Sequence, residues 1–245
     1  KNQLYVMESA AQTEEKKINS SEDIGQQSPS RDINRSNTPN LARQQSLKAC
    51  AQKETPMKAV FVTEIGKPLI VSEIVPPKPG KDEVLIKVEA APIHPSDLAF
   101  IRGYHNHLQP PFQVGLEGSG TVLASGGGAG NSLVGQRVSF GASPAKPGSW
   151  AQFIVTNAKN CFPLDKSVCF EDGACGIINP FTAVAFAETI KQEKHKAVVQ
   201  TTAASQLGRM IINLLKKEGI KIISIVRKTE QEKIVEESDV VLNSE

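Results

Sequence analysis

Residues Ala203 to Gly208 read Ala-Ala-Ser-Gln-Leu-Gly and lie between a short apolar segment, HKAVVQ, and a helical pattern. Small residues in such a loop let a ligand approach the backbone, and the start of the helix offers free N–H groups and a favourable dipole to an anion. Only the last glycine of a G-x-G-x-x-G fingerprint is present. The loop predicts a dinucleotide site, with an ordinary strand-to-helix turn as the alternative. The residues predicted to bind the dinucleotide here are Ala203, Ser205, Gln206, Leu207 and Gly208.

Two adjacent cations, Arg227 and Lys228, follow the next apolar segment, IKIISIV. A site for unphosphorylated NAD usually places an acid here to accept a hydrogen bond from the ribose hydroxyl, whereas a 2′-phosphate requires positive charge. The pair therefore favours NADP(H) as the cofactor, and both residues are predicted to bind it. Two solvated surface charges are the alternative.

The elements around these residues predict a strand–helix–strand unit. HKAVVQ and IKIISIV are short strands, and between them apolar residues recur at helical spacing until Gly219. A right-handed crossover of this kind gives a parallel sheet with the loop at the carboxyl ends of the strands. A polar helical segment, 228–238, and a third strand, DVVLN, follow. Since a complete doubly wound sheet has about six strands, residues 186–245 are predicted to form a C-terminally incomplete one.

Residues 57–185 are predicted to form a β-rich domain. From Met57 to about residue 160, β-branched and polar residues alternate between turn signals such as the proline cluster at 76–79 and the SGGGAG segment. This pattern is typical of a small barrel or sandwich, whose core would include Phe61, Phe140, Trp150 and Phe153. Residues 1–56 are poor in large apolar side chains and are predicted to be a disordered extension.

Composition excludes several classes of function. The net charge of +2 arises from mixed signs without a basic block interleaved with aromatics, so nucleic acid is not an expected partner. No run of 18 apolar residues exists to span a membrane. The four cysteines form no CxxC pair and are interpreted as reduced thiols. We expect a cytoplasmic location, with mitochondria as the alternative suggested by NLARQQSLKAC.

From Met57 onward the chain resembles the medium-chain dehydrogenase/reductase superfamily, in which a GroES-like domain precedes a Rossmann domain. The matching segments are MKAV, EVLIKVEAAPIHPSDLAFIRGYH, VGLEGSGTV, VGQRVSF, GSWAQFIV, INPFTA and TTAASQLGRM, in that order. The resemblance implies a GroES-like barrel followed by a partial Rossmann NADP-binding domain, an active cleft between the two, and dimers joined through the Rossmann domains.

Within this superfamily, zinc-dependent members have Gly-His-Glu where this chain has Gly115-Leu116-Glu117, and a catalytic cysteine at the position of His94. They also carry a four-cysteine lobe where this chain reads SGGGAGNSLVGQRV. A catalytic zinc needs three protein ligands, so no metal is expected. His94, or the pair His105 and His107, could in principle bind a metal, but no further ligands accompany them at a recognisable spacing.

The resemblance also implies site residues. Tyr104 in IRGYH corresponds to a tyrosine that is proposed to donate a proton or orient the substrate carbonyl in enoyl reductases, with a barrel-surface aromatic as the alternative. The zinc-free branches usually have Asn-Pro where this chain has His94-Pro95. Tyr104 and His94 are the predicted catalytic residues. Asn179 and Thr182 in INPFTA are predicted to lie beside the nicotinamide.

The predicted function is a zinc-free, NADPH-dependent oxidoreductase of the quinone oxidoreductase and enoyl reductase kind. It would transfer hydride to a conjugated carbonyl of a small-molecule substrate: a quinone, an enone or a 2-enoyl thioester. The resemblance makes a homodimer the expected assembly. The alternative is a non-catalytic, reductase-like binding or assembly subunit, which the degenerate Ala-x-Ser-x-x-Gly loop and the three-strand sheet would suit.

Overall fold

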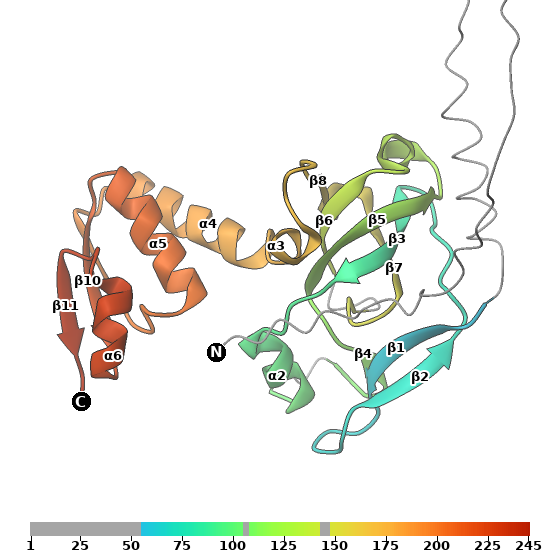
Figure 1. The fold of residues 1–245 in the computed structure, drawn as a ribbon, viewed down its shortest axis with the longest axis horizontal. Coiled ribbons are helices and arrows are strands. Elements are labelled where there is room, and N and C mark those ends of the chain that lie inside the picture. The colour runs from blue at the N-terminus through green and yellow to red at the C-terminus, as the bar shows by residue number, and fades with distance from the viewer. Residues whose placement is uncertain (1–54, 105–107, 143–147) are drawn as a thin grey trace, which may run out of the picture.

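A computed structural model describes residues 55–104, 108–142 and 148–245. The first of its two parts is β-rich and the second alternates strands and helices, as Figure 1 shows. The predicted extension over 1–56 lies almost wholly outside the described residues and stays a prediction.

Two antiparallel sheets build the first part. Strands β1 (Met57–Val62), β2 (Ile70–Ile74) and β4 (Phe112–Gln113) form one sheet in the order β2-β1-β4. The other has the order β7-β3-β5-β6-β8, from β3 (Glu83–Ala90), β5 (Glu117–Ser125), β6 (Arg137–Gly141), β7 (Phe153–Asn157) and β8 (Cys161–Pro163). The predicted β-rich domain is thus present as two sheets, which are not joined into the expected closed barrel within the described ranges.

Alternating side chains make the core of the larger sheet. Ile86, Val122, Phe140 and Ile154 have no exposed surface and pack together from four neighbouring strands. Each such side chain contributes roughly 1.5–3 kcal/mol by leaving water. Phe140 is therefore a core residue as predicted, whereas Phe61 and Phe153 pack at the edge of a smaller cluster around Met57.

Short helices surround this domain. They are the α-helices α2 (Pro95–Ile101) and α3 (Phe170–Ala174) and the 3₁₀ turns η1 (Gly128–Leu133) and η2 (Ala158–Asn160). Helix α4 (Ile178–Gln192) then leads from the β-rich part to the second part, as Figure 1 shows. The predicted domain boundary at residue 185 falls inside α4, and it stays a prediction.

The second part is a parallel sheet with the order β11-β10-β9, from β9 (Ala197–Gln200), β10 (Lys221–Val226) and β11 (Val240–Asn243). Helix α5 (Gln206–Lys217) connects β9 to β10, and α6 (Thr229–Glu232) and η3 (Lys233–Val235) connect β10 to β11. The predicted strand–helix–strand unit and the third strand are both present. Helix α5 is followed by Gly219, whose φ of +69° suits glycine.

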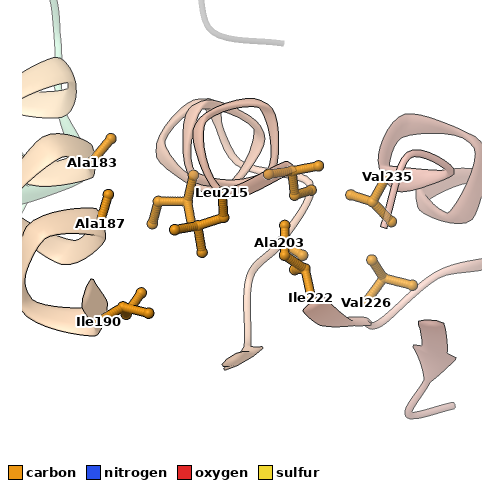
Figure 2. Close-up of a cluster of buried hydrophobic side chains, with 10 residues drawn as sticks. Ala183, Ala187, Ile190, Ala203, Leu215, Ile222, Val226 and Val235 are labelled. Carbon is orange, nitrogen blue, oxygen red and sulfur yellow. The ribbon is translucent and has the colours of Figure 1, made fainter. Parts of the chain in front are cut away.

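One hydrophobic cluster joins the elements of this second part. Leu215 of α5 lies between Ala187 of α4 and Ile222 of β10, as Figure 2 shows. The other face of the sheet differs, because Val199, Val240 and Leu242 are exposed whereas their neighbours Val198 and Val241 pack against the cluster. Helix α4 is therefore fixed to the three-stranded parallel sheet through α5.

Candidate functional site

A cavity of about 940 Å³ lies between the β-rich part and the parallel sheet. Residues 93–96, at the start of α2, form one wall, and residues of α4 from Ile178 to Ile190 form a second. The third wall consists of 198–202 and 204–209, which include the loop between β9 and α5. Elements from both parts of the chain therefore meet around one space large enough for a cofactor.

The cavity brings together most of the residues predicted from the sequence. His94 lies on the first wall, Asn179 on the second, and the fingerprint residues on the third. The predicted site residues that line the cavity are His94, Asn179, Ser205, Gln206, Leu207 and Gly208.

Other predicted residues lie outside the cavity lining. Tyr104 is 73% exposed. Thr182, one turn into α4, donates its hydroxyl to the Ile178 carbonyl oxygen at 2.6 Å, and Ala203 is fully buried in the cluster beneath the loop. The contacts predicted for these residues with substrate or cofactor stay predictions. Arg227 is likewise absent from the lining.

Ser205 determines where α5 begins. Its backbone is extended, and its hydroxyl accepts a hydrogen bond from the Gly208 N–H at 3.0 Å. Because the first four N–H groups of a helix have no partner within the helix, this cap leaves the N–H groups of Gln206 and Leu207 for a ligand. The positive end of the helix dipole lies at the same place and favours an anion.

Gly208 allows the loop to pack tightly on the helix. A Cβ at this position would overlap the carbonyl oxygen of Ala203. This is the role of the third glycine in a dinucleotide fingerprint, which permits close packing between helix and strand. The loop thus fits a pyrophosphate although the other two glycines are replaced.

Thr202 carries backbone strain in this loop. Its φ of +57° is rare for a β-branched residue, and it lines the cavity. Strain of this kind costs roughly 1–3 kcal/mol and often occurs at binding sites. No sequence pattern indicated it, since a β-branched residue does not predict a positive φ.

Arg227 and Lys228 follow β10 directly and are both exposed. Since β9 and β10 are parallel, the pair lies at the same edge of the sheet as the β9–α5 loop. Lys228 is 3.8 Å from Glu230 in a solvent-exposed ion pair. In the described part of the chain no carboxylate lies within ion-pair distance of the Arg227 guanidinium.

Glu117 is the residue that sequence reasoning missed. It has no exposed surface, and its Oε1 lies 2.6 Å from His94 Nε2. Its Oε2 accepts hydrogen bonds from the N–H groups of Ile177 and Ile178, each at 2.9 Å. An acid within the apolar and small residues of GLEGSGTV was a usable signal, because a buried carboxylate needs partners.

The hydrogen bond with Glu117 raises the pKa of His94, more than burial lowers it. Asp97 lies next to this pair and is fully buried. Its Oδ2 accepts a hydrogen bond from the His94 backbone N–H at 2.7 Å, and burial raises its pKa. His94 therefore stands in a buried, acidic surrounding at the wall of the cavity.

Among the described residues, no three side chains of His, Cys, Asp or Glu lie close enough together to bind one metal ion. Leu116 immediately precedes Glu117 and has no ligand atom. His105 and His107, the pair of histidines that could in principle bind a metal, lie outside the described residues. The thiols of Cys161, Cys169 and Cys175 are free, and burial raises the pKa of Cys161 to about 12.

Comparison with known proteins decides the family. Residues 80–198 match the alcohol dehydrogenase GroES-like domain. A crystal structure from Mesorhizobium loti, described as a putative NADPH:quinone reductase, is 40% identical and covers 78% of this chain and 60% of its own, with a TM-score of 0.70. The chain belongs to the medium-chain dehydrogenase/reductase superfamily. A further member, a mycobacterial protein solved in complex with NADPH, is 29% identical with a TM-score of 0.68 and covers 77% of this chain and 59% of its own.

Curated members of the superfamily are also similar. The mitochondrial enoyl-[acyl-carrier-protein] reductase of Arabidopsis thaliana is 33% identical over 178 residues, which are 70% of this chain and 47% of that protein. A probable quinone oxidoreductase of Leishmania amazonensis is 30% identical over 148 residues, or 60% of this chain and 42% of that protein. This superfamily member therefore spans about half the length of the curated relatives it matches.

Proposed function

We propose that this chain carries the cofactor site of an NADPH-dependent reductase, which transfers hydride without zinc to a conjugated carbonyl acceptor. The cavity carries the proposal, because the N-terminus of α5 lines the same space as His94 and Asn179. A nicotinamide cofactor would supply the hydride chemistry, and the residues of the chain would bind and orient it. The acceptor is a quinone, an enone or a 2-enoyl thioester.

The phosphates of the cofactor would bind at the start of α5. The Ser205 cap leaves two N–H groups there, and the contact of Gly208 with Ala203 brings the loop close to the helix. Arg209 also lines the cavity and adds a positive charge one turn into the helix. These groups together favour a pyrophosphate over a neutral ligand.

Arg227 and Lys228 support NADPH over NADH. They lie after β10, where an acid would bind the ribose hydroxyls of NAD, and they offer two cations to a 2′-phosphate. The relative named as an NADPH:quinone reductase, and the mycobacterial protein solved with NADPH, favour the same choice.

The chemistry at the acceptor would create negative charge. When hydride reaches the electrophilic carbon, charge develops on the carbonyl oxygen, and a proton must follow. We assign the donated proton to Tyr104, and to His94, which lines the cavity and whose pKa is raised, the electrostatic stabilisation of the charge. Zinc is not needed in this scheme, and the hydrocarbon side chain of Leu116 supports its absence.

The assembly and location belong to the same proposal. A homodimer joined through the Rossmann-type sheets is expected from the superfamily. A cytoplasmic location is proposed, and several relatives are named as mitochondrial. No helix among the described residues is long and apolar enough to cross a membrane.

The test is a titration of the chain with NADPH and with NADH, followed by the fluorescence of Trp150, the single tryptophan. Trp150 Nε1 donates to the Pro92 carbonyl oxygen at 3.0 Å, two residues before His94, so binding should quench it. NADPH is expected to bind more tightly than NADH. The double variant Arg227→Ala/Lys228→Ala should lose about tenfold or more in NADPH affinity and little in NADH affinity.

Lys217→Ala is the matched control, since it removes an exposed cation at the other end of α5. It should leave both affinities within about twofold. Binding of neither nucleotide by the unmodified chain would contradict the proposal and favour the non-catalytic alternative. Tighter binding of NADH would contradict the choice of cofactor.

A further inference from the structure

Glu117 lies behind the wall of the cavity and does not line it. A carboxylate with no exposed surface is costly unless several donors compensate for lost water. Glu117 has three such donors, from His94 and from two consecutive backbone N–H groups. This arrangement stabilises the charged carboxylate inside the protein.

The two oxygens of Glu117 hold two different walls of the cavity. Oε1 bonds to His94, on the wall next to α2, and Oε2 bonds to Ile177 and Ile178. Ile178 and its neighbour Asn179 line the cavity from the first turn of α4. One side chain of β5 therefore links two walls that belong to segments more than 80 residues apart, since His94 and Asn179 differ by 85 positions.

The hydrogen bond also determines which nitrogen of His94 carries a proton. An ionised carboxylate only accepts hydrogen bonds, so His94 Nε2 must donate. In the neutral ring, Nδ1 is then the acceptor. His94 and Asp97 form a capping box at the start of α2, in which the His94 side chain faces the backbone N–H of Asp97 and the Asp97 carboxylate faces the backbone N–H of His94. The groups that face the ring are Glu117 from β5 and Asp97 from α2, with Cys175 after α3 close enough to Glu117 for their charges to interact.

We infer that Glu117 is a positioning residue of the cofactor and acceptor site: its carboxylate keeps the proton of His94 on Nε2 and holds the first turn of α4, so that His94 and Asn179 keep their places on the cavity wall. The inference rests on the proposed function, because the residues that Glu117 positions line the proposed cofactor cavity. Glu117 acts through these neighbours and contacts neither ligand.

The wild-type chain provides the first test, which needs no variant. The ¹⁵N spectrum of the His94 ring, recorded at a pH where the ring is neutral, should show the proton on Nε2. A proton on Nδ1 would overturn the inference.

Glu117→Gln provides the second test, because it separates the two tasks of the carboxylate. The amide oxygen can still accept from Ile177 and Ile178, but the amide NH₂ then faces His94, whose Nε2 must become an acceptor. We expect the ring proton to move to Nδ1, the apparent pKa of His94 to fall, and the NADPH dissociation constant to rise about fivefold or more. An unchanged ring spectrum, or an NADPH affinity within about twofold of wild type, would overturn the inference.

Ser139→Ala is the matched control, since Ser139 is a buried polar residue whose hydroxyl donates to the Gly173 carbonyl oxygen at 2.6 Å, outside the cavity lining. It should lower stability and leave the His94 ring spectrum unchanged. If Glu117→Gln does not fold, Glu117→Asp keeps the charge but shortens the side chain, and should weaken NADPH binding likewise. Failure of the wild-type chain to bind NADPH would contradict the proposed function, whereas the ring spectrum tests Glu117 independently.

Discussion

The carbonyl oxygen of Ala203 lies against the Cα of Gly208, so close that a Cβ on residue 208 would overlap it. The atoms that would collide are the backbone carbonyl oxygen of Ala203 and a Cβ bonded directly to the backbone of residue 208. Neither belongs to a flexible side chain that could rotate away. Gly208→Ala should therefore displace the β9–α5 loop and lower the free energy of unfolding by about 1–3 kcal/mol. Urea denaturation measures this loss.

Gly141→Ala is the control for that substitution. Its nearest neighbour would be Ile177 Cγ2 at 3.7 Å, which is ordinary van der Waals contact. The alanine there should change stability far less than the one at 208. Equal effects of the two substitutions would contradict the packing assigned to Gly208.

Ser205→Ala removes the N-cap of α5. The lost hydrogen bond from the Gly208 N–H should cost about 1 kcal/mol of stability, within the range of roughly 0.5–2 kcal/mol for such caps. Ser205→Asp should restore the cap but repel an anionic ligand at the helix start. Thermal unfolding and NADPH titration of both variants would separate the two roles, and normal NADPH binding by Ser205→Asp would contradict a phosphate site there.

The stability contributed by His94 should depend on pH. Glu117 raises the pKa of His94 above its ordinary value of 6.5. Folding therefore favours the protonated ring, and this contribution is fully present below pH 6.5 and is lost as pH rises through the pKa in the folded state. We expect the stability difference between wild type and His94→Asn to shrink over that interval, measured by urea denaturation at each pH.

The same pH series in a Glu117→Gln background tests the cause. Without the carboxylate the main reason for the raised pKa is gone, so the stability difference caused by His94→Asn should depend less on pH. If the stability difference between wild type and His94→Asn instead grows with pH while Glu117 is present, the predicted effect of Glu117 on the pKa of His94 is contradicted.

Much of the fold could be predicted because local patterns specify it. The spacing of apolar residues predicted α5, and apolar runs between turn signals predicted β9, β10 and β11. The β-rich domain followed from alternation along strands such as β3 and β5. The way in which those strands pair depends on the register between residues that are distant in sequence. The register shifts where β3 pairs with β5 are an example. Local sequence patterns do not predict such shifts.

The site was predictable where one segment supplies it and less so where distant segments meet. Ser205 to Gly208 are neighbours in sequence, so their common loop could be recognised. Glu117 escaped because its partners, His94 and Ile177, lie 23 and 60 residues away, and its own motif indicates only an incomplete zinc site. The positive φ of Thr202 likewise depends on how β9 and α5 are held together, not on the residue itself.

The most direct measurement of the central claim is a backbone ¹H–¹⁵N NMR titration of the chain with NADPH, since it locates the ligand on the fold. The amides of Gln206, Leu207 and Gly208 should shift most. Amides near His94 and Asn179 should shift with them, because both line the same cavity. The absence of shifts at the start of α5, or shifts confined to surfaces away from this cavity, would contradict the account.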